Sequence, residues 1–145
     1  MYNYKIQACI GPSIDQVERC TTVLDTGAGP NLVKSSLLTT ETLKTMKHDQ
    51  QIVNLAGAGG HRLKPLGIVT LTVKVGSNIT RQPFVVVDAL GADAILGTTY
   101  IDEHIEFLWI RRRAVIFPNG EHFPIEKRPG MLKPCLLYTS DAADD

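Results

Sequence analysis

Residues 66–75 alternate between apolar and polar side chains, and this pattern constrains the fold more than any other in the chain. In an extended strand, Val69, Leu71, Val73 and Val75 share one face, while two threonines and a lysine share the other. A strand with one apolar face must bury that face against other elements. We therefore expect a core that is built from several strands.

Other short apolar runs are bounded by Gly and Pro, which is typical of a mostly β protein. We expect strands at residues 4–10, 19–25, 84–87, 107–110 and 114–117. Thr99 followed by Asp102 resembles a capping box and predicts one short helix that ends near His104, and residues 40–47 hold a turn or two of helix. By pattern alone, residues 2–117 form a small β-barrel or a β-sandwich.

The composition changes after Phe117. Four prolines and two glycines in residues 118–134 predict a linker. Residues 135–145, CLLYTSDAADD, resemble a translated sequencing-library adapter and are interpreted as a non-native tail, the alternative being a natural disordered end. Without this tail the chain has 15 basic and 12 acidic residues.

Charge and composition exclude several classes of function. The formal net charge of the 145 residues is zero, no apolar run is long enough to span a membrane, and the first residues do not resemble a signal peptide. The three cysteines and four histidines lack metal-ligand spacing, and residues 111–113 (Arg-Arg-Arg) are interpreted as a solvated turn. We therefore expect no metal, no cofactor, no nucleic acid and no membrane partner, and a location in the cytoplasm, without secretion.

The chemically informative segment is VLDTGAGPNLV, residues 23–33. An apolar strand delivers Asp25 to a turn that Gly27 allows to be tight. A carboxylate at the end of a buried strand needs partners or has a chemical role. Asp-Thr-Gly alone is a weak signal, but about 70 residues later the segment 94–97 (Ala-Ile-Leu-Gly) leads into the expected helix.

These motifs, with the glycine-rich segment 54–61 between them, resemble in order and spacing the retropepsins, the retroviral and retrotransposon aspartic proteases of peptidase family A2. By the same motifs, the chain resembles the proteases of gypsy-type retroelements, which implies a location within retroelement particles as the alternative to the cytoplasm. The resemblance covers nearly all of residues 2–117. It implies a closed all-β acid-protease barrel that forms half of a two-fold symmetric dimer, and an aspartic endopeptidase activity on a polyprotein.

The resemblance also implies roles for individual residues. Asp25 is the catalytic carboxylate, and Thr26 makes hydrogen bonds across the dimer. Gly27 offers its backbone to the substrate, and Ala28 lines a subsite. Ile95 lies in the segment that packs beneath the catalytic loops and contributes to substrate binding.

The segment that contains Gly57, Ala58, Gly59 and Gly60 corresponds to the flap that closes over the substrate. Its alternatives are a plain hairpin turn and a phosphate-binding loop, although it lacks the G-x-G-x-x-G pattern of such loops. His61 at its edge has no expected catalytic role.

Many retroviral members have an arginine and an acidic residue at two positions that are Thr98 and Gly29 here. Both charges are absent together, so neither is left unpaired. Substrate contacts that the acidic residue makes in those members are not carried over to this chain.

One Asp-Thr-Gly per chain implies that a protease site needs two chains. The expected partners are therefore a second copy of this chain and a peptide or polyprotein substrate. Two alternatives remain open from the sequence: a catalytically inactive retropepsin-like dimerisation module, and a ligand-binding barrel in which Asp25 only caps a turn.

Overall fold

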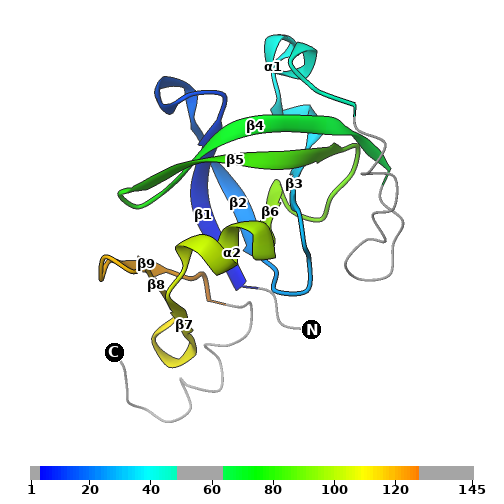
Figure 1. Ribbon diagram of the computed structural model, residues 1–145. Helices are drawn as coiled ribbons and strands as arrows, with labels where there is room; N and C mark the ends of the chain where they lie inside the picture. The colour runs from blue at the N-terminus through cyan, green and yellow to red at the C-terminus, as the bar shows by residue number, and fades with distance from the viewer. Residues whose placement is uncertain (1–3, 49–63, 128–145) are drawn as a thin grey trace.

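Figure 1 shows a computed structural model of the chain, which describes residues 4–48 and 64–127. Six strands form a closed barrel in the order β1-β2-β6-β3-β5-β4. They are β1 (Tyr4–Gly11), β2 (Glu18–Leu24), β3 (Asn31–Lys34), β4 (Pro65–Val75), β5 (Asn78–Val87) and β6 (Ala94–Leu96). This closed, mostly β architecture confirms the expected fold class, and it resolves the choice between barrel and sandwich.

The remaining elements are short. A three-stranded sheet has the order β7-β8-β9 and lies beside one end of the barrel (Figure 1). Its strands are β7 (Phe107–Trp109), β8 (Ala114–Ile116) and β9 (His122–Pro124). The α-helices are α1 (Thr40–Lys44), which is little more than one turn, and α2 (Thr98–His104), which follows β6. Single 3-10 turns are Ile14–Gln16, Ser35–Leu37 and Ile110–Arg112.

The barrel combines antiparallel and parallel pairs. β6 runs parallel to β2 and antiparallel to β3, and β3 runs parallel to β5. The hairpin of β4 and β5 then joins β1 antiparallel and closes the barrel through the Cα pairs Cys9–Lys74 and Gly11–Thr72. The short strand β6 therefore lies between β2 and β3, so the chain returns from a distant segment to the end of β2.

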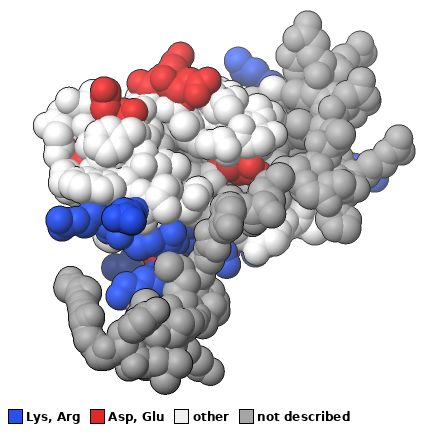
Figure 2. Space-filling view, turned by 90° about the horizontal axis from the view of Figure 1, so that it is seen from below, with Lys and Arg blue, Asp and Glu red and all other residues white. Residues whose placement is uncertain are grey.

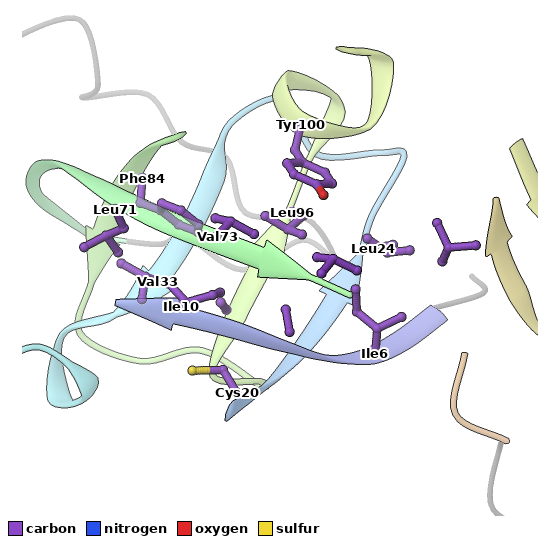
Figure 3. Close-up of a cluster of buried hydrophobic side chains, with 14 of the residues drawn as sticks. Ile6, Ile10, Cys20, Leu24, Val33, Leu71, Val73, Phe84, Leu96 and Tyr100 are labelled. Atoms are coloured by element: carbon purple, nitrogen blue, oxygen red, sulfur yellow. The ribbon is translucent and has the colours of Figure 1, made fainter. Parts of the chain in front are cut away.

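The core fills the inside of the barrel, as Figure 3 shows. Val69, Leu71, Val73 and Val75 are each at most 2% exposed, which confirms the predicted alternation of β4. Tyr100 of α2 closes one end of this core, and its burial raises the pKa of its hydroxyl. The main cluster receives side chains from all six barrel strands. At about 25 cal/mol per Å² of apolar surface removed from water, such burial is the dominant stabilising contribution.

The run from Phe84 to Val87 is buried on both faces, as expected for a continuous apolar run. Phe84 and Val86 point into the main core. Val85 and Val87 join Leu32 in a second cluster, against which Ile95 packs. The barrel wall therefore carries a separate apolar surface at these strands.

Beyond the expected domain boundary at residue 117, the structure continues with a strand and a buried side chain. Residues 122–124 form β9, which pairs with β8, and Ile125 is 3% exposed in the main core. The backbone N–H of Glu126 donates to the carbonyl of Lys5 at 2.8 Å and ties this segment to β1. Residues 128–134 of the expected linker, and the expected tail, lie outside the described residues.

Candidate active site

Asp25 is the first residue after β2, and it is 6% exposed. Its backbone N–H donates to the carbonyl of Leu96 at 3.0 Å, so β6 fixes its position. Its Oδ1 accepts a hydrogen bond from the N–H of Gly27 at 2.8 Å, and its carbonyl accepts one from the N–H of Ala28 at 3.2 Å. These bonds close a tight turn that leaves Thr26 and Gly27 exposed.

The start of α2 clamps this turn from the other side. The backbone N–H groups of Thr98 and Thr99 donate to the carbonyls of Ala28 and Gly29 at 2.8 and 3.0 Å. The hydroxyl of Thr99 also donates to the Gly29 carbonyl at 2.9 Å. The first N–H groups of a helix have no partner within the helix, and here they bind the loop that carries Asp25.

This geometry corrects the predicted capping box. The N-cap of α2 is Gly97, no side chain caps the helix, and Thr99 lies inside it. The Thr99 hydroxyl bonds to a loop that is 70 residues away in sequence, so local pattern could not reveal its partner. Thr98 and Gly29, the two positions at which many retroviral members have charged residues, are joined here by one uncharged hydrogen bond, from the Thr98 hydroxyl to the Gly29 carbonyl at 3.5 Å.

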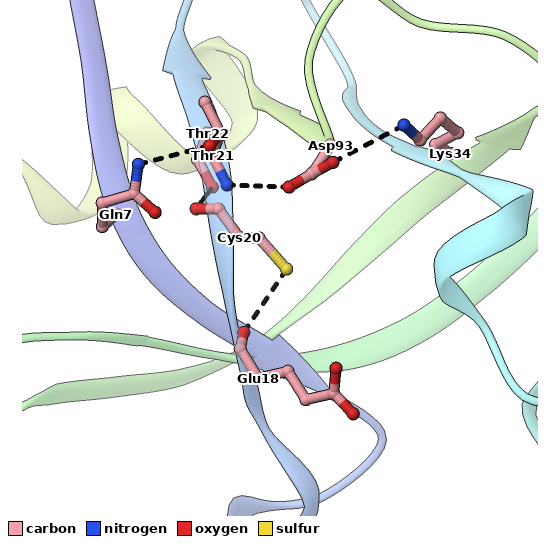
Figure 4. Close-up of polar contacts among 7 residues, drawn as sticks. All are labelled: Gln7, Glu18, Cys20, Thr21, Thr22, Lys34 and Asp93. Carbon is pink, nitrogen blue, oxygen red and sulfur yellow. Dashed lines mark hydrogen bonds and ion pairs between the residues drawn. The ribbon is translucent and has the colours of Figure 1, made fainter.

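Asp93 holds the start of β6 in place, as Figure 4 shows. Its carboxylate accepts from the backbone N–H of Thr21 at 3.0 Å and lies 3.5 Å from the Nζ of Lys34. It thereby ties β6 to both of its neighbouring strands. The pKa of the Cys20 thiol is raised to about 11. Burial of the thiol is the largest cause, and the negative charge of Asp93 is the second.

The strand register places an apolar surface on the same face as Asp25. Val23 pairs with Ile95, Ile95 pairs with Leu32, and Leu32 pairs with Val85. Paired residues point to the same face of a sheet, and Asp25 lies two residues beyond Val23. Ile95, a predicted substrate-binding residue, thus belongs to an apolar row that leads to the carboxylate.

The other predicted site residues have different environments. Thr26 and Gly27 are exposed next to Asp25, whereas Ala28 is 8% exposed and its carbonyl is directed to α2. Residues 57–60 and His61, the expected flap, lie outside the described residues. Among the residues described, Lys34 and Asp93 form an ion pair and Nε2 of His104 lies 3.9 Å from a Glu103 carboxylate oxygen, and no basic side chain in these parts lies within ion-pair distance of Asp25.

Three polar residues beside the site were missed by sequence reasoning. Asn31 and Gln82 are 1% and 4% exposed and hydrogen-bond to each other, and Gln82 also contacts His104. Asn31 is the first residue of β3 and Gln82 lies in the polar half of β5, so neither stands out in the sequence. Their partners are distant in the chain, so the pattern did not identify them.

The three consecutive arginines are not equivalent. Arg111 and Arg112 are exposed, and the Arg112 guanidinium lies 5.2 Å from the ring centroid of Trp109. Arg113 is directed inward, where it lies 5.5 Å from the ring centroid of Tyr4 and donates to the Glu126 carbonyl. The predicted solvated turn is therefore correct for two of the three. In Figure 2, several Lys and Arg side chains gather at the lower left, while most of the visible Asp and Glu side chains lie at the top, near a further basic side chain.

Solved structures that are similar to this chain include the following two. The retroviral protease-like domain of Ddi1 from Leishmania major matches with a TM-score of 0.65 and 13% identity, over 90% of this chain and 99% of that one. The EIAV protease, solved with the inhibitor HBY-793, matches with a TM-score of 0.50 and 19% identity, over 70% of this chain and 88% of that one. At these identities the comparison shows the fold, and this chain has a retropepsin-like fold.

The sequence itself matches no protein-family model and no curated protein. Within residues 4–48 and 64–127, no helix is long and apolar enough to cross a membrane. The same parts of the chain contain no group of three or more His, Cys, Asp or Glu side chains that could hold a metal ion.

Proposed function

We propose that this chain is an aspartic endopeptidase of the retropepsin type, active as a homodimer in which each copy contributes Asp25. The observation that carries the proposal is the environment of that carboxylate. It is 6% exposed, it follows a barrel strand directly, and α2 clamps its loop so that Thr26 and Gly27 are exposed. The retropepsin-like fold of the whole described region supports the same activity.

The chemistry requires two carboxylates. One acts as a base that activates a water molecule, and the other acts as an acid that protonates the substrate carbonyl. Aspartic proteases are the established case in which two adjacent carboxylates cannot both ionise and therefore share a proton. Because this chain has one Asp-Thr-Gly, the second carboxylate comes from a partner chain on a two-fold axis. The exposed Thr26 hydroxyl is available for hydrogen bonds across that axis.

The proposed substrate is an extended peptide with apolar side chains near the scissile bond. The partly buried Ile95 shares the face of Asp25 and offers an apolar contact, and it packs against the buried Leu32 and Val85. Ala28 would line a subsite, and residues 57–60 would close over the bound peptide and exclude water. We propose a retroelement polyprotein as the natural substrate, with residues 135–145 as a non-native tail.

The test is cleavage of a mixed peptide library at about pH 5, over a range of protein concentrations. Activity should rise faster than linearly with concentration, and Asp25→Asn should abolish it. Asp15→Asn is the matched control, because Asp15 is an exposed carboxylate in the turn after β1. It should cleave like the unmodified protein.

A tandem dimer, with two copies joined by a flexible linker, separates weak dimerisation from absent chemistry. Cleavage by the tandem dimer that is linear in concentration would support the proposal. If Asp25→Asn cleaves as well as the unmodified protein, the catalytic role of Asp25 is wrong. A dimer that cleaves no peptide would favour the inactive dimerisation module.

A further inference from the structure

One peptide unit connects Asp25 to a buried polar side chain on the opposite side of the loop. The carbonyl of Leu96 accepts a hydrogen bond from the Asp25 N–H at 3.0 Å. The N–H of the same peptide unit, which belongs to Gly97, donates to Oδ1 of Asn31 at 3.1 Å. The peptide that fixes the backbone of Asp25 is therefore itself held by Asn31.

The orientation of the Asn31 amide follows from its partners. Gly97 offers only an N–H, so the oxygen of Asn31 must face it. Pro83 offers only a carbonyl, which accepts from Nδ2 of Asn31 at 3.0 Å. The same Nδ2 donates to Oε1 of Gln82 at 3.3 Å. Because the Gly97 N–H can only donate and the Pro83 carbonyl can only accept, the Asn31 amide has a single possible orientation.

The orientation of Gln82 follows in turn. Because Oε1 faces Asn31, Nε2 faces Nε2 of His104 at 2.9 Å and the Thr80 hydroxyl at 3.3 Å. A donor on Gln82 requires His104 to accept at Nε2, so the proton of the neutral imidazole is on Nδ1. Around this ring lie Tyr100, with a centroid separation of 4.9 Å, and a Glu103 carboxylate oxygen 3.9 Å from Nε2.

All the donors in this series point in the same direction. Asp25 donates to the 96–97 peptide, which donates to Asn31, which donates to Gln82, which donates to His104. We call these linked groups the amide chain. Hydrogen bonds aligned head to tail polarise one another, and a buried chain of them holds its members more rigidly than separate bonds would.

We infer that Asn31 and Gln82 are positioning residues, which hold the backbone of Asp25 through the amide chain that ends at His104. This inference rests on the proposed peptidase function for its catalytic consequence. Asn31 and Gln82 come from two different barrel strands, β3 and β5, and His104 from the end of α2. The turn that carries Asp25 is thereby braced by side chains that make no hydrogen bond to Asp25 itself.

The test uses three variants in the full chain. Asn31→Leu removes the amide at similar size, and Gln82→Met breaks only the outer links. Asn31→Asp keeps an acceptor for Gly97 but loses both donors. Thr72→Val is the matched control, because Thr72 is a 3% exposed polar residue on β4 outside the amide chain.

The first readout is NMR and does not depend on activity. In Asn31→Leu the amide protons of Gly97 and Asp25 should both move upfield and exchange faster with solvent. Gln82→Met should produce smaller changes of the same sign at both sites. Asn31→Asp should keep the Gly97 hydrogen bond and lose the link to Gln82. The nitrogen shifts of His104 should report its Nδ1–H tautomer in the unmodified protein and in Thr72→Val.

The second readout is kinetic. A small displacement of Asp25 lowers kcat in Asn31→Leu between about 10-fold and 100-fold, and leaves KM within about threefold because the substrate contacts remain. Thr72→Val should change neither constant. The inference is wrong if Asn31→Leu leaves the amide signals of Asp25 and Gly97 unchanged and lowers the melting temperature only as much as Thr72→Val does. If the unmodified protein cleaves no peptide, the proposed function fails, while the NMR readout still decides on the amide chain.

Discussion

A Cβ atom on Gly97 would lie 2.6 Å from the carbonyl oxygen of Ala28, closer than real side chains approach backbone atoms. The carbonyl oxygens of Pro30 and Gly29 would be 2.6 and 2.7 Å away. Three carbonyls of the loop that carries Asp25 therefore surround the start of α2. Lack of space, and not an unusual backbone conformation, requires glycine at this position.

Gly97→Ala should therefore destabilise the protein, because the loop and helix must separate to admit the methyl group. We expect a loss of about 1–3 kcal/mol in the free energy of unfolding, measured by urea denaturation. Gly91→Ala is the control, since a Cβ there meets no atom within 4 Å, and its effect should stay within about 0.5 kcal/mol. Equal stability of the two variants would contradict the close approach.

Glu121 lies at the contact between the small sheet and the barrel, and its hydrogen bonds predict that the stability of the protein depends on pH. Its carboxylate accepts from the N–H and the hydroxyl of Ser77 and from Nδ2 of Asn78. These bonds, above all those from Ser77, lower the pKa of Glu121 below its usual value of 4.5. A lowered folded-state pKa adds stability above the unfolded-state pKa, and this stability is lost as the pH falls through the folded-state value.

Glu121→Gln should accordingly lower the melting temperature by a constant amount between about pH 5.5 and 7. The difference from the unmodified protein should shrink below about pH 4.5, as Glu121 itself becomes protonated. The control is Glu106→Gln, because the exposed Glu106 side chain forms no hydrogen bond or ion pair among the described residues. A Glu121→Gln difference that grows towards low pH would have the wrong sign for this mechanism.

Cys20 should react slowly with thiol-alkylating reagents. Its pKa of about 11 leaves roughly one thiolate in a thousand at about pH 8, and the thiolate is the reactive form. Peptide mapping after iodoacetamide treatment should find the less buried Cys9 modified before Cys20. The rate at Cys20 should keep rising up to about pH 11, so a plateau below about pH 9.5 would contradict the raised pKa.

The parts of the fold that were predictable depend on local patterns. The alternation of Val69, Leu71 and Val73 identified β4 because a strand repeats every two residues. Asp25 was found because a short motif places a carboxylate at the end of an apolar strand. Gly97 was identified because it ends the segment 94–97, which leads into α2. In each case the decisive residues lie within a few positions of one another.

The parts that were missed depend on partners distant in sequence. The hydrogen bond between Asn31 and Gln82 spans 51 residues, and no local pattern indicates it. β9 was hidden by its proline content, which usually marks a linker. Pro124 is tolerated because β9 is an edge strand of the order β7-β8-β9, where a missing N–H need not leave a buried partner unsatisfied.

The last prediction tests how far the folded domain extends. Ile125 follows the expected boundary by eight residues, yet it is 3% exposed in the main core and its N–H donates to the Arg113 carbonyl at 2.8 Å. Ile125→Ala should lower the free energy of unfolding by about 2–4 kcal/mol, which is typical of truncating a buried isoleucine to alanine. Ile79→Ala is the matched control, because Ile79 is 51% exposed on β5 and its truncation should cost less than about 0.5 kcal/mol.

A chain that ends at Phe117 should be less stable still, because it also removes β9 and uncovers the edge of β8. Urea denaturation of both isoleucine variants and of this truncation, at one protein concentration, measures the three effects together. If Ile125→Ala and the truncation unfold at the same urea concentration as Ile79→Ala, residues 118–127 are a linker after all. If both are destabilised in the predicted order, the domain includes them, because β9 and Ile125 cover apolar surface that the barrel alone would expose to water.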